Sequence, residues 1–241
     1  RVPMMTRGAY APTQAVHRHL NRIHAVSDRI ADDLVAHYTI PREQIDVIYH
    51  GVDPELFHDV SESKSTTGPL NVLYAGRLWD IDKGVFLLPV MMAELEKAGA
   101  DVMLTVAGGG PDEAELRRRF EQAGVNHRVV MTGPVPLEKM NSLFAEADCF
   151  VFPSRFEGCG FAVLEAMSAG CAPVVSDIRG SLRVLVNQGQ CGKLARVGDG
   201  RDFARGVLEL YRDRPHLKQM QQAARERVVS TYTLRHMAEN Y

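Results

Sequence analysis

The sequence lacks a surplus of either charge, since 28 Lys plus Arg residues stand against 30 Asp plus Glu in 241 residues, for a net charge of −2. A protein that grips nucleic acid through phosphates needs a cationic surplus, so nucleic acid is not an expected partner. No apolar run approaches the ~18 residues of a membrane-spanning helix. A hydrophobic share of 45% and a charged share of 24% are ordinary globular usage, which argues against a disordered or fibrous chain.

Cysteine is scarce and shows no metal-binding pattern. The four cysteines form no CxxC pair and have no histidine at ligand spacing, so a metal site is not expected. No secretory signal is present, and we therefore expect reduced cysteines and a cytoplasmic location, with peripheral attachment at the inner membrane face left open. The chain begins at Arg1 without an initiator Met, and we expect it to be a piece of a longer protein.

Several motifs of common enzyme classes are missing. There is no GxGxxG for a nicotinamide dehydrogenase, no GK[ST] for a P-loop, and no GxSxG for a hydrolase. The nine histidines form no HExxH. A carboxylate pair for glycoside hydrolysis stays open, because the separation that matters there is spatial rather than sequential.

What is present is an alternation of short apolar runs with amphipathic stretches. Short, nearly continuous apolar runs suit strands that are buried on both faces of a sheet. The intervening stretches have helical periodicity, so the pattern predicts βαβ units: an α/β, Rossmann-like fold with a parallel sheet and helices on both faces. The predicted strands are Asn71–Ala75, Val102–Ala107, Arg128–Thr132, Cys149–Pro153 and Ala172–Ser176, and the helices between them are Asp112–Ala123, Leu137–Ala145 and Phe161–Gly170.

The chain divides into four segments. Residues 1–58 hold a helix over Asp28–His37, N-capped by Ser27, and a short strand over Ile45–Tyr49. Residues 59–69 are polar and Ser/Thr-rich, and predict a linker. Residues 70–214 form the α/β domain, and residues 215–241 a helical tail that begins where Pro215 interrupts the pattern.

The loop after the first strand of the domain carries two cations between glycines. Gly76-Arg77 is followed six residues later by Lys83-Gly84, and Arg and Lys at a strand end suit an anion held above the sheet edge. We expect Gly84 to open the next helix, whose N–H groups favour negative charge. The alternative is a solvated loop with two surface cations.

A second glycine-rich loop, Gly108-Gly109-Gly110-Pro111, follows the next strand. It predicts either a close approach of backbone to a ligand or simply a turn at positive φ. Pro111 is expected at the first position of the following helix.

The third loop is the most informative. Glu157 lies in a glycine-rich turn. Glu165 follows after seven intervening residues, in a helix that is expected to start near Phe161. The glycines let backbone N–H groups point at phosphate, and a carboxylate such as Glu165 can accept two hydrogen bonds from a sugar diol. The alternative is that one acid only stabilises the helix terminus and the other only a loop.

The order of these motifs resembles that of the retaining glycosyltransferases of family 4, which have the GT-B fold. The motifs are Gly76-Arg77, Lys83-Gly84, Gly108–Pro111 and Glu157-x7-Glu165. The resemblance runs from about residue 23 to 195. It implies that residues 1–58 are a remnant of the N-terminal acceptor domain with the interdomain crossing, that 70–214 bind a nucleotide sugar, and that 215–241 are the returning tail. Most of the N-terminal domain would be missing from this chain, and its partner in function would be that domain.

The resemblance also implies roles for single residues. Arg77 and Lys83 would neutralise the donor diphosphate as it leaves, Glu157 would lie against the donor sugar, and Glu165 would accept the ribose hydroxyls. No cofactor or metal is implied, only a UDP- or GDP-type nucleotide-sugar donor and a carbohydrate or lipid-linked acceptor. The chemistry implied is front-face displacement with retention. The backbone and glycine positions expected to contact the donor are Gly76, Gly109, Gly158, Cys159, Gly160 and Phe161.

The sequence departs from the family pattern at a few positions. Cys159 stands where Phe is usual, Phe161-Ala162 where Leu-Pro is usual, and Arg183 where an acid is usual. The extra cations Arg179 and Arg183 put the donor type in doubt and favour an additional negative group on it. Because the resemblance implies that most of the N-terminal domain is missing, two other functions stay open: a non-catalytic nucleotide-sugar-binding module and a nucleotide-sugar epimerase of the same fold.

Overall fold

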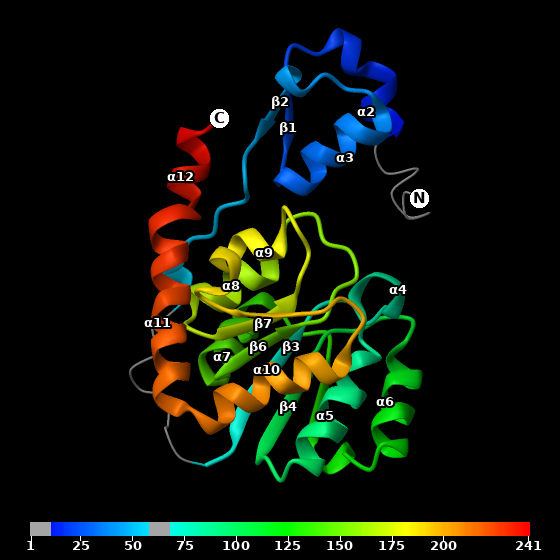
Figure 1. The fold of residues 1–241 in the computed structure, drawn as a ribbon, viewed down its shortest axis with the longest axis vertical. Helices are drawn as coiled ribbons and strands as arrows, with labels where there is room; N and C mark the ends of the chain where they lie inside the picture. The colour runs from blue at the N-terminus through cyan, green and yellow to red at the C-terminus, as the bar shows by residue number, and fades with distance from the viewer. Residues whose placement is uncertain (1–10, 58–67) are drawn as a thin grey trace.

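The computed structural model describes residues 11–57 and 68–241, and it is built around one twisted parallel sheet (Figure 1). Within these residues a six-stranded sheet has the order β5-β4-β3-β6-β7-β8, and every neighbouring pair is parallel. The α/β class with a parallel sheet is therefore confirmed. The strands are β3 Leu70–Ala75, β4 Val102–Ala107, β5 Val129–Gly133, β6 Cys149–Phe152, β7 Ala172–Ser176 and β8 Lys193–Ala195.

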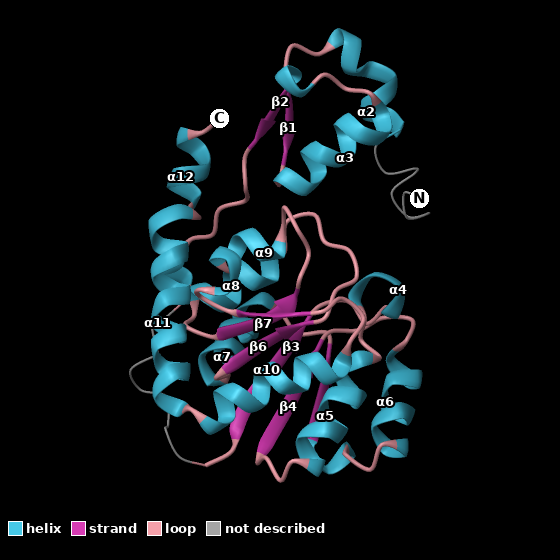
Figure 2. Ribbon diagram, in the orientation of Figure 1, coloured by secondary structure: helices cyan, strands magenta, loops and turns pink. Residues whose placement is uncertain are grey.

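Helices cover both faces of this sheet (Figure 2). Parallel neighbours must be joined by right-handed crossovers, so helices between β3, β4 and β5 lie on one face, and those between β6, β7 and β8 on the other. Helix α10 packs against α5, and α11 packs against α8. The helices of the domain and tail are α4 Asp80–Lys83, α5 Leu87–Lys97, α6 Glu113–Gln122, α7 Leu137–Glu146, α8 Phe161–Ser168, α9 Leu182–Leu185, α10 Gly200–Arg212, α11 Arg214–Thr231 and α12 Leu234–Glu239.

The strand order changes direction between β3 and β6. The chain first builds outward from β3 through β4 to β5, then returns to add β6, β7 and β8 on the other side. At such a switch point the loops after the two central strands diverge to opposite faces, which leaves a crevice at the carboxyl edge. The loops after β3 and β6 are the two that carry the predicted charged residues.

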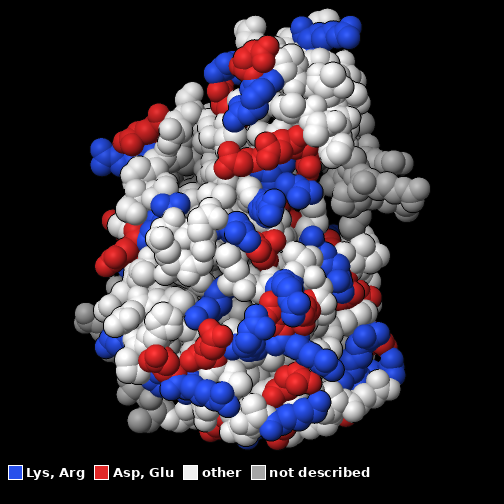
Figure 3. Space-filling model, in the orientation of Figure 1, with Lys and Arg blue, Asp and Glu red and all other residues white. Residues whose placement is uncertain are grey.

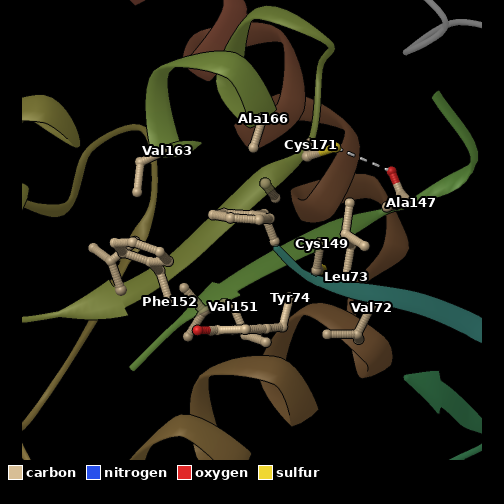
Figure 4. Close-up of a cluster of buried hydrophobic side chains, with 14 of the residues drawn as sticks. Val72, Leu73, Tyr74, Ala147, Cys149, Val151, Phe152, Val163, Ala166 and Cys171 are labelled. Atoms are coloured by element: carbon tan, nitrogen blue, oxygen red, sulfur yellow. Dashed lines mark hydrogen bonds between the residues drawn. The ribbon is translucent and has the colours of Figure 1, made fainter. Parts of the chain in front are cut away.

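The core of the domain lies between the sheet and its helices (Figure 4). Tyr74 and Phe150 are fully buried, and β6 and β7 have no exposed residue. Cys171 is buried too, and its thiol donates to the backbone oxygens of Phe144 and Ala147 at 3.1 and 3.4 Å. All four cysteines are buried in the core as thiols, as expected for small buried hydrophobic residues.

A small lobe made of residues 11–57 lies beside the carboxyl edge of the sheet (Figure 1). Its own core packs helix α3 against a two-stranded parallel sheet, β1-β2. Ser27 caps α3 by accepting a hydrogen bond from the backbone N–H of Ile30 at 3.3 Å, which confirms the predicted cap. The elements are α2 Ala11–Val16, β1 Ile23–Ala25, α3 Asp28–Tyr38 and β2 Ile45–Val47.

Gly180 holds the small lobe against the domain through hydrogen bonds to its carbonyl oxygen. The carbonyl oxygen of Gly180, in the loop after β7, accepts hydrogen bonds from the backbone N–H of Arg29 at 2.9 Å and from the Tyr49 hydroxyl at 3.0 Å. A Cβ on Gly180 would lie 2.7 Å from the Arg29 nitrogen. The start of α3 is therefore held against the same edge of the sheet that carries the predicted site.

The C-terminal tail packs against the segment around Val52, where the chain leaves the small lobe. Helix α11 begins with Pro215 in its first turn, as the interrupted pattern predicted. Val52 and Thr233 form a parallel bridge, with the Val52 N–H donating to Tyr232 and the Leu234 N–H donating to Val52. The predicted boundaries at 58, 69 and 214 stay predictions, and residues 58–67 of the linker lie outside the described residues.

The sequence prediction was wrong about several local features. Gly84 ends α4 in a left-handed conformation and does not open a helix, because α5 begins at Leu87. Pro111 lies in a turn before α6, which begins at Glu113. The predicted strand over Ile45–Tyr49 ends at Val47, and strands β1 and β8, of three residues each, were missed. Runs this short carry too little periodicity to be recognised in sequence.

Charges of both signs are interspersed over the face drawn in Figure 3, with no large field of one sign. In the described part of the chain, no helix is both long enough and apolar enough to cross a bilayer.

Candidate functional site

The predicted site residues meet at the switch point of the sheet. The loop after β3 carries Arg77 and Lys83, and the loop after β6 carries Glu157. Because β3 and β6 are parallel neighbours, both loops leave the same edge. The pairing of these two strands brings together Lys83 and Glu157, which lie 74 positions apart in the chain.

Lys83 and Glu157 form the central ion pair. Lys83 Nζ donates to Glu157 Oε2 at 2.7 Å, and the side chains are only 19% and 15% exposed. The Ser154 hydroxyl lies 3.5 Å from the same carboxylate oxygen, and Lys83 Nζ lies 5.2 Å from the ring centre of Phe152. Two opposite charges shielded from water attract each other more strongly than charges on the surface. Each charge must stay paired, however, because the attraction has to offset the cost of its desolvation.

Arg77 is held in a second ion pair at the same edge. Its Nη2 donates to Asp82 Oδ2 at 2.5 Å, and its guanidinium lies 4.5 Å from the ring centre of Trp79. The Arg77 side chain is 52% exposed, whereas that of Asp82 is 13% exposed. The guanidinium is thus fixed on one side and open to solvent on the other.

Residues outside the predicted set, Arg155 and three aspartates, tie the loops together. Arg155 donates from Nε to the Asp80 carbonyl oxygen at 3.2 Å and pairs with the Asp80 carboxylate at 3.3 Å. Its backbone N–H donates to the carbonyl oxygen of Asp82 at 2.7 Å. The Asp80 N–H donates in turn to Asp112, in the loop after β4, at 2.6 Å. In the sequence, Asp80 and Asp82 stand out only as acids near the two cations, and no motif marks Arg155.

The glycine-rich loops after β3 and β4 lie side by side. The Gly76 N–H donates to the Ala107 oxygen at 3.0 Å, and the Leu78 N–H donates to the Gly109 oxygen at 2.9 Å. A Cβ on the neighbouring Gly110 would lie 2.3 Å from the Leu78 oxygen. The second loop is therefore a close backbone packing against the first, and the structure brings Gly76 and Gly109 to the same edge as Lys83.

The turn before α8 follows Glu157 directly. Gly160 is the N-cap of α8, with φ of 79°. Cys159 is buried, and burial raises the pKa of its thiol to about 11, so it is not a reactive thiolate at neutral pH. Phe161 is 46% exposed, and its ring meets His50 of the small lobe edge to face at 6.1 Å. Gly158 faces α3, where a Cβ on this glycine would lie 3.7 Å from Ile30 Cδ1.

Glu165 lies one turn into α8 and lines a cavity of about 440 Å³. The cavity is bounded by the segment Gly51–Phe57, by α7, by α8 and by the start of α12. Burial raises the pKa of the Glu165 carboxyl to about 7. Neither Lys83 nor Glu157 lines this cavity, so the two glutamates of the Glu157-x7-Glu165 motif serve different parts of the site.

The raised pKa of Glu165 predicts a pH-dependent cost to folding. Below about pH 4.5 the carboxyl is protonated in both states, whereas near and above pH 7 the folded protein must ionise it in a desolvated position. Stability is therefore lost as the pH rises from 4.5 to 7. We expect Glu165→Gln to raise Tm at pH 8 by about 2–4 °C. This corresponds to removing a destabilisation of ~1 kcal/mol, the cost of ionising Glu165 after allowance for its partial exposure to solvent.

The same substitution should leave Tm nearly unchanged at pH 5, as scanning calorimetry at both values would show. Glu121→Gln, at an exposed glutamate of α6, is the matched control and should shift Tm equally at both pH values. A Glu165→Gln effect that is equal at pH 5 and pH 8 would contradict the raised pKa.

The extra cation at Arg183 is neutralised within the chain. Its guanidinium makes two hydrogen bonds to the Asp177 carboxylate, one of them from Nε to Oδ1 at 2.5 Å. Arg183 is therefore not a free cation. Like Arg77 and Lys83, it is paired with a carboxylate, and the expectation that Arg179 and Arg183 favour a more negative donor stays a prediction.

No group of three or more His, Cys, Asp or Glu side chains that could hold a metal ion occurs within residues 11–57 and 68–241. The charged residues that converge on the carboxyl edge are instead paired cations and carboxylates, with Lys83–Glu157 as the least exposed of these pairs. Such an arrangement can exchange its carboxylates for the oxygens of an anionic ligand.

Two family models match the chain. The model of glycosyl transferases group 1 covers residues 58–227, and that of glycosyltransferase family 4 covers residues 4–56. A GDP-mannose:cellobiosyl-diphosphopolyprenol alpha-mannosyltransferase of Xanthomonas oryzae is 32% identical over 160 residues, 66% of this chain and 41% of that protein. A D-inositol 3-phosphate glycosyltransferase of Paenarthrobacter aurescens is 31% identical over 193 residues, 76% of this chain and 47% of that protein. The chain spans about half the length of these relatives.

Solved glycosyltransferases share the fold. A glycosyltransferase from Rickettsia africae has a TM-score of 0.81 at 17% identity, with 99% of this chain and 65% of that chain covered. HepE of Anabaena, solved in complex with UDP and glucose, has a TM-score of 0.81 at 20% identity, with 93% of this chain and 62% of that chain covered. At these identities the likeness is one of fold.

Proposed function

The chain belongs to the glycosyl transferases group 1 family, within the family 4 glycosyltransferases of GT-B fold, and from this we propose that its whole protein transfers a sugar from a nucleotide-diphosphate sugar to a hydroxyl acceptor with retention and without a metal. The described domain is proposed to bind the donor. The observation that carries the proposal is the half-buried Lys83–Glu157 pair, which joins the two loops at the switch point of the sheet at 2.7 Å.

The proposed chemistry needs charge and positioning more than a reactive side chain. Both cations are neutralised within the chain, Lys83 by Glu157 and Arg77 by Asp82. A donor diphosphate would take over Lys83 and the open side of Arg77, which frees Glu157 to accept hydrogen bonds from the donor sugar. A diphosphate offers more negative charge and more acceptor oxygens than one carboxylate, and an Arg can engage two phosphate oxygens at once.

In the transfer step we propose a displacement on one face of the sugar. The acceptor oxygen forms a bond to the anomeric carbon as the bond from that carbon to the phosphate oxygen breaks. The acceptor's proton passes to the departing phosphate oxygen, whose growing negative charge Lys83 and Arg77 stabilise. The acceptor is proposed to be a carbohydrate or a lipid-linked glycan, bound with the help of residues outside this chain, and the location to be cytoplasmic.

Binding of a nucleoside diphosphate to this chain is the direct test of the donor site. We expect isothermal titration to show binding of UDP or GDP, and Arg77→Ala to weaken it about tenfold or more, the worth of a charge-assisted hydrogen bond. Arg118→Ala removes an exposed arginine of α6 and should leave the affinity unchanged. Binding that is equal in Arg77→Ala and Arg118→Ala contradicts the role of Arg77.

Turnover is tested in the whole protein. Transfer that persists in EDTA and gives a product with the anomeric configuration of the donor, read by NMR, supports the proposal, whereas an inverted product overturns retention. Nucleotide binding without any turnover identifies a binding module, and conversion of the donor without an acceptor identifies an epimerase.

A further inference from the structure

The cavity beside Glu165 has a chemistry unlike that of the phosphate-binding edge. Its volume of about 440 Å³ is within the range of small-molecule sites. Its walls include Leu56, Phe161 and Leu234, which are 58%, 46% and 53% exposed. Three large hydrophobic side chains open to solvent around one cavity suit the faces of a planar ring.

The polar side chains of the cavity are mostly carboxylates, and none of them carries a positive charge. Glu138 and Glu165 contribute carboxylates. The Asn141 amide nitrogen donates one hydrogen to the backbone oxygen of Leu56 at 2.9 Å, so one N–H and the side-chain oxygen of Asn141 remain for a ligand. Among the residues that line the cavity in the described chain there is no Lys, Arg or His.

The cavity lies within reach of the phosphate-binding edge. Helix α8 starts at Phe161, directly after the turn that carries Glu157, and Glu165 lies four residues further. Four residues of helix span about 6 Å. A ligand whose phosphates lie at Lys83 can therefore extend along the first turn of α8, place a sugar diol at Glu165 and enter the cavity with the group beyond it.

We propose that this group is guanine and that Glu138 selects it, so that the donor is a guanosine-diphosphate sugar. The inference rests on the proposed function and narrows it. Guanine presents two adjacent kinds of donor, the ring N1–H and the exocyclic amino group, to which one carboxylate can bind through both oxygens.

The other common bases fit an acceptor-lined cavity less well. Uracil has one N–H donor between two carbonyl oxygens, and those oxygens would face the Glu138 carboxylate. Adenine has its amino group beside an acceptor nitrogen. A carboxylate that faces the carbonyl oxygens or the acceptor nitrogen of a base repels it, which disfavours that base more than the mere lack of a contact does.

The test is titration of this chain with GDP, UDP and ADP under one set of conditions. We expect GDP to bind at least about tenfold more tightly than UDP or ADP, which corresponds to one charge-assisted contact. UDP or ADP binding as tightly as GDP overturns the guanine assignment while leaving the proposed function intact. Failure of all three to bind overturns both.

Substitution of Glu138 tests whether this residue is the one that selects guanine. Glu138→Gln should lower the affinity for GDP about tenfold, because the amide keeps one acceptor oxygen but loses the charge, and it should not lower the affinity for UDP, because the repulsion of the uracil oxygens is removed. Glu146→Gln changes a glutamate at the other end of α7 and should change neither affinity, with Tm showing that both variants fold. Equal losses of GDP and UDP affinity in Glu138→Gln overturn the role of Glu138.

Discussion

Lys83→Ala is expected to weaken the binding of a nucleoside diphosphate by about 10- to 100-fold, as ~1.5–3 kcal/mol of charge-assisted hydrogen bonding is lost. The substitution has a second effect, because Glu157 is only 15% exposed and loses its partner. The carboxylate left behind adds negative charge at the position where phosphate must bind. Titration calorimetry on the folded variant measures the loss.

Two comparisons separate these effects. Lys97→Ala removes a lysine that is 71% exposed at the end of α5, and should leave binding unchanged. The double variant Lys83→Ala/Glu157→Ala should be more stable than the sum of the two single variants predicts, by about 0.5–3 kcal/mol, since the second substitution removes the charge that the first leaves unpaired. Stability effects that simply add would show that the two side chains do not interact.

Gly84→Ala is expected to destabilise the fold by about 2–5 kcal/mol, from two costs that add. Gly84 has φ of +61°, and a Cβ there would lie 2.2 Å from the backbone oxygen of Pro153, the first residue after β6. The left-handed conformation costs a residue with a side chain roughly 1–2 kcal/mol, and the contact with backbone adds about 1–3 kcal/mol more. For a domain of this size each kcal/mol lowers Tm by about 2–4 °C, so the loss is visible in thermal unfolding.

Gly99→Ala provides a matched control for the conformational part. Gly99 has φ of +66°, but its Cβ position has nothing within 4 Å. Gly99→Ala should therefore show only the smaller cost of the left-handed backbone. If the two variants had the same Tm, the close approach of the loop after β3 to the loop after β6 would not be a constraint on the fold.

These two predictions concern one piece of structure. Gly84 allows the loops after β3 and β6 to touch, Asp82 and Arg155 join them through a backbone hydrogen bond of 2.7 Å, and Lys83 then meets Glu157. A disturbance at Gly84 is thus expected to reach the donor site as well as the core.

The sequence by itself determined the elements that have a strong local signal. Runs such as Ala172–Ser176, which is buried at every position, could only be interior strands. Ser27 marked the start of helix α3, since a side-chain cap depends on residues close in sequence, and the good helix formers after Phe161 marked α8. The order of the motifs likewise indicated the family, because spacing is preserved in the chain itself.

The tertiary structure alone decided which charges face each other. Lys83 could have been a free cation, and its pairing with Glu157 depends on β3 and β6 being neighbours in the sheet. Arg183, which the sequence presents as an extra cation, is likewise paired with Asp177, six residues earlier. An ion pair depends on distances of a few ångströms between side chains, and strand order and loop conformation set those distances, whereas local sequence periodicity carries no information about them.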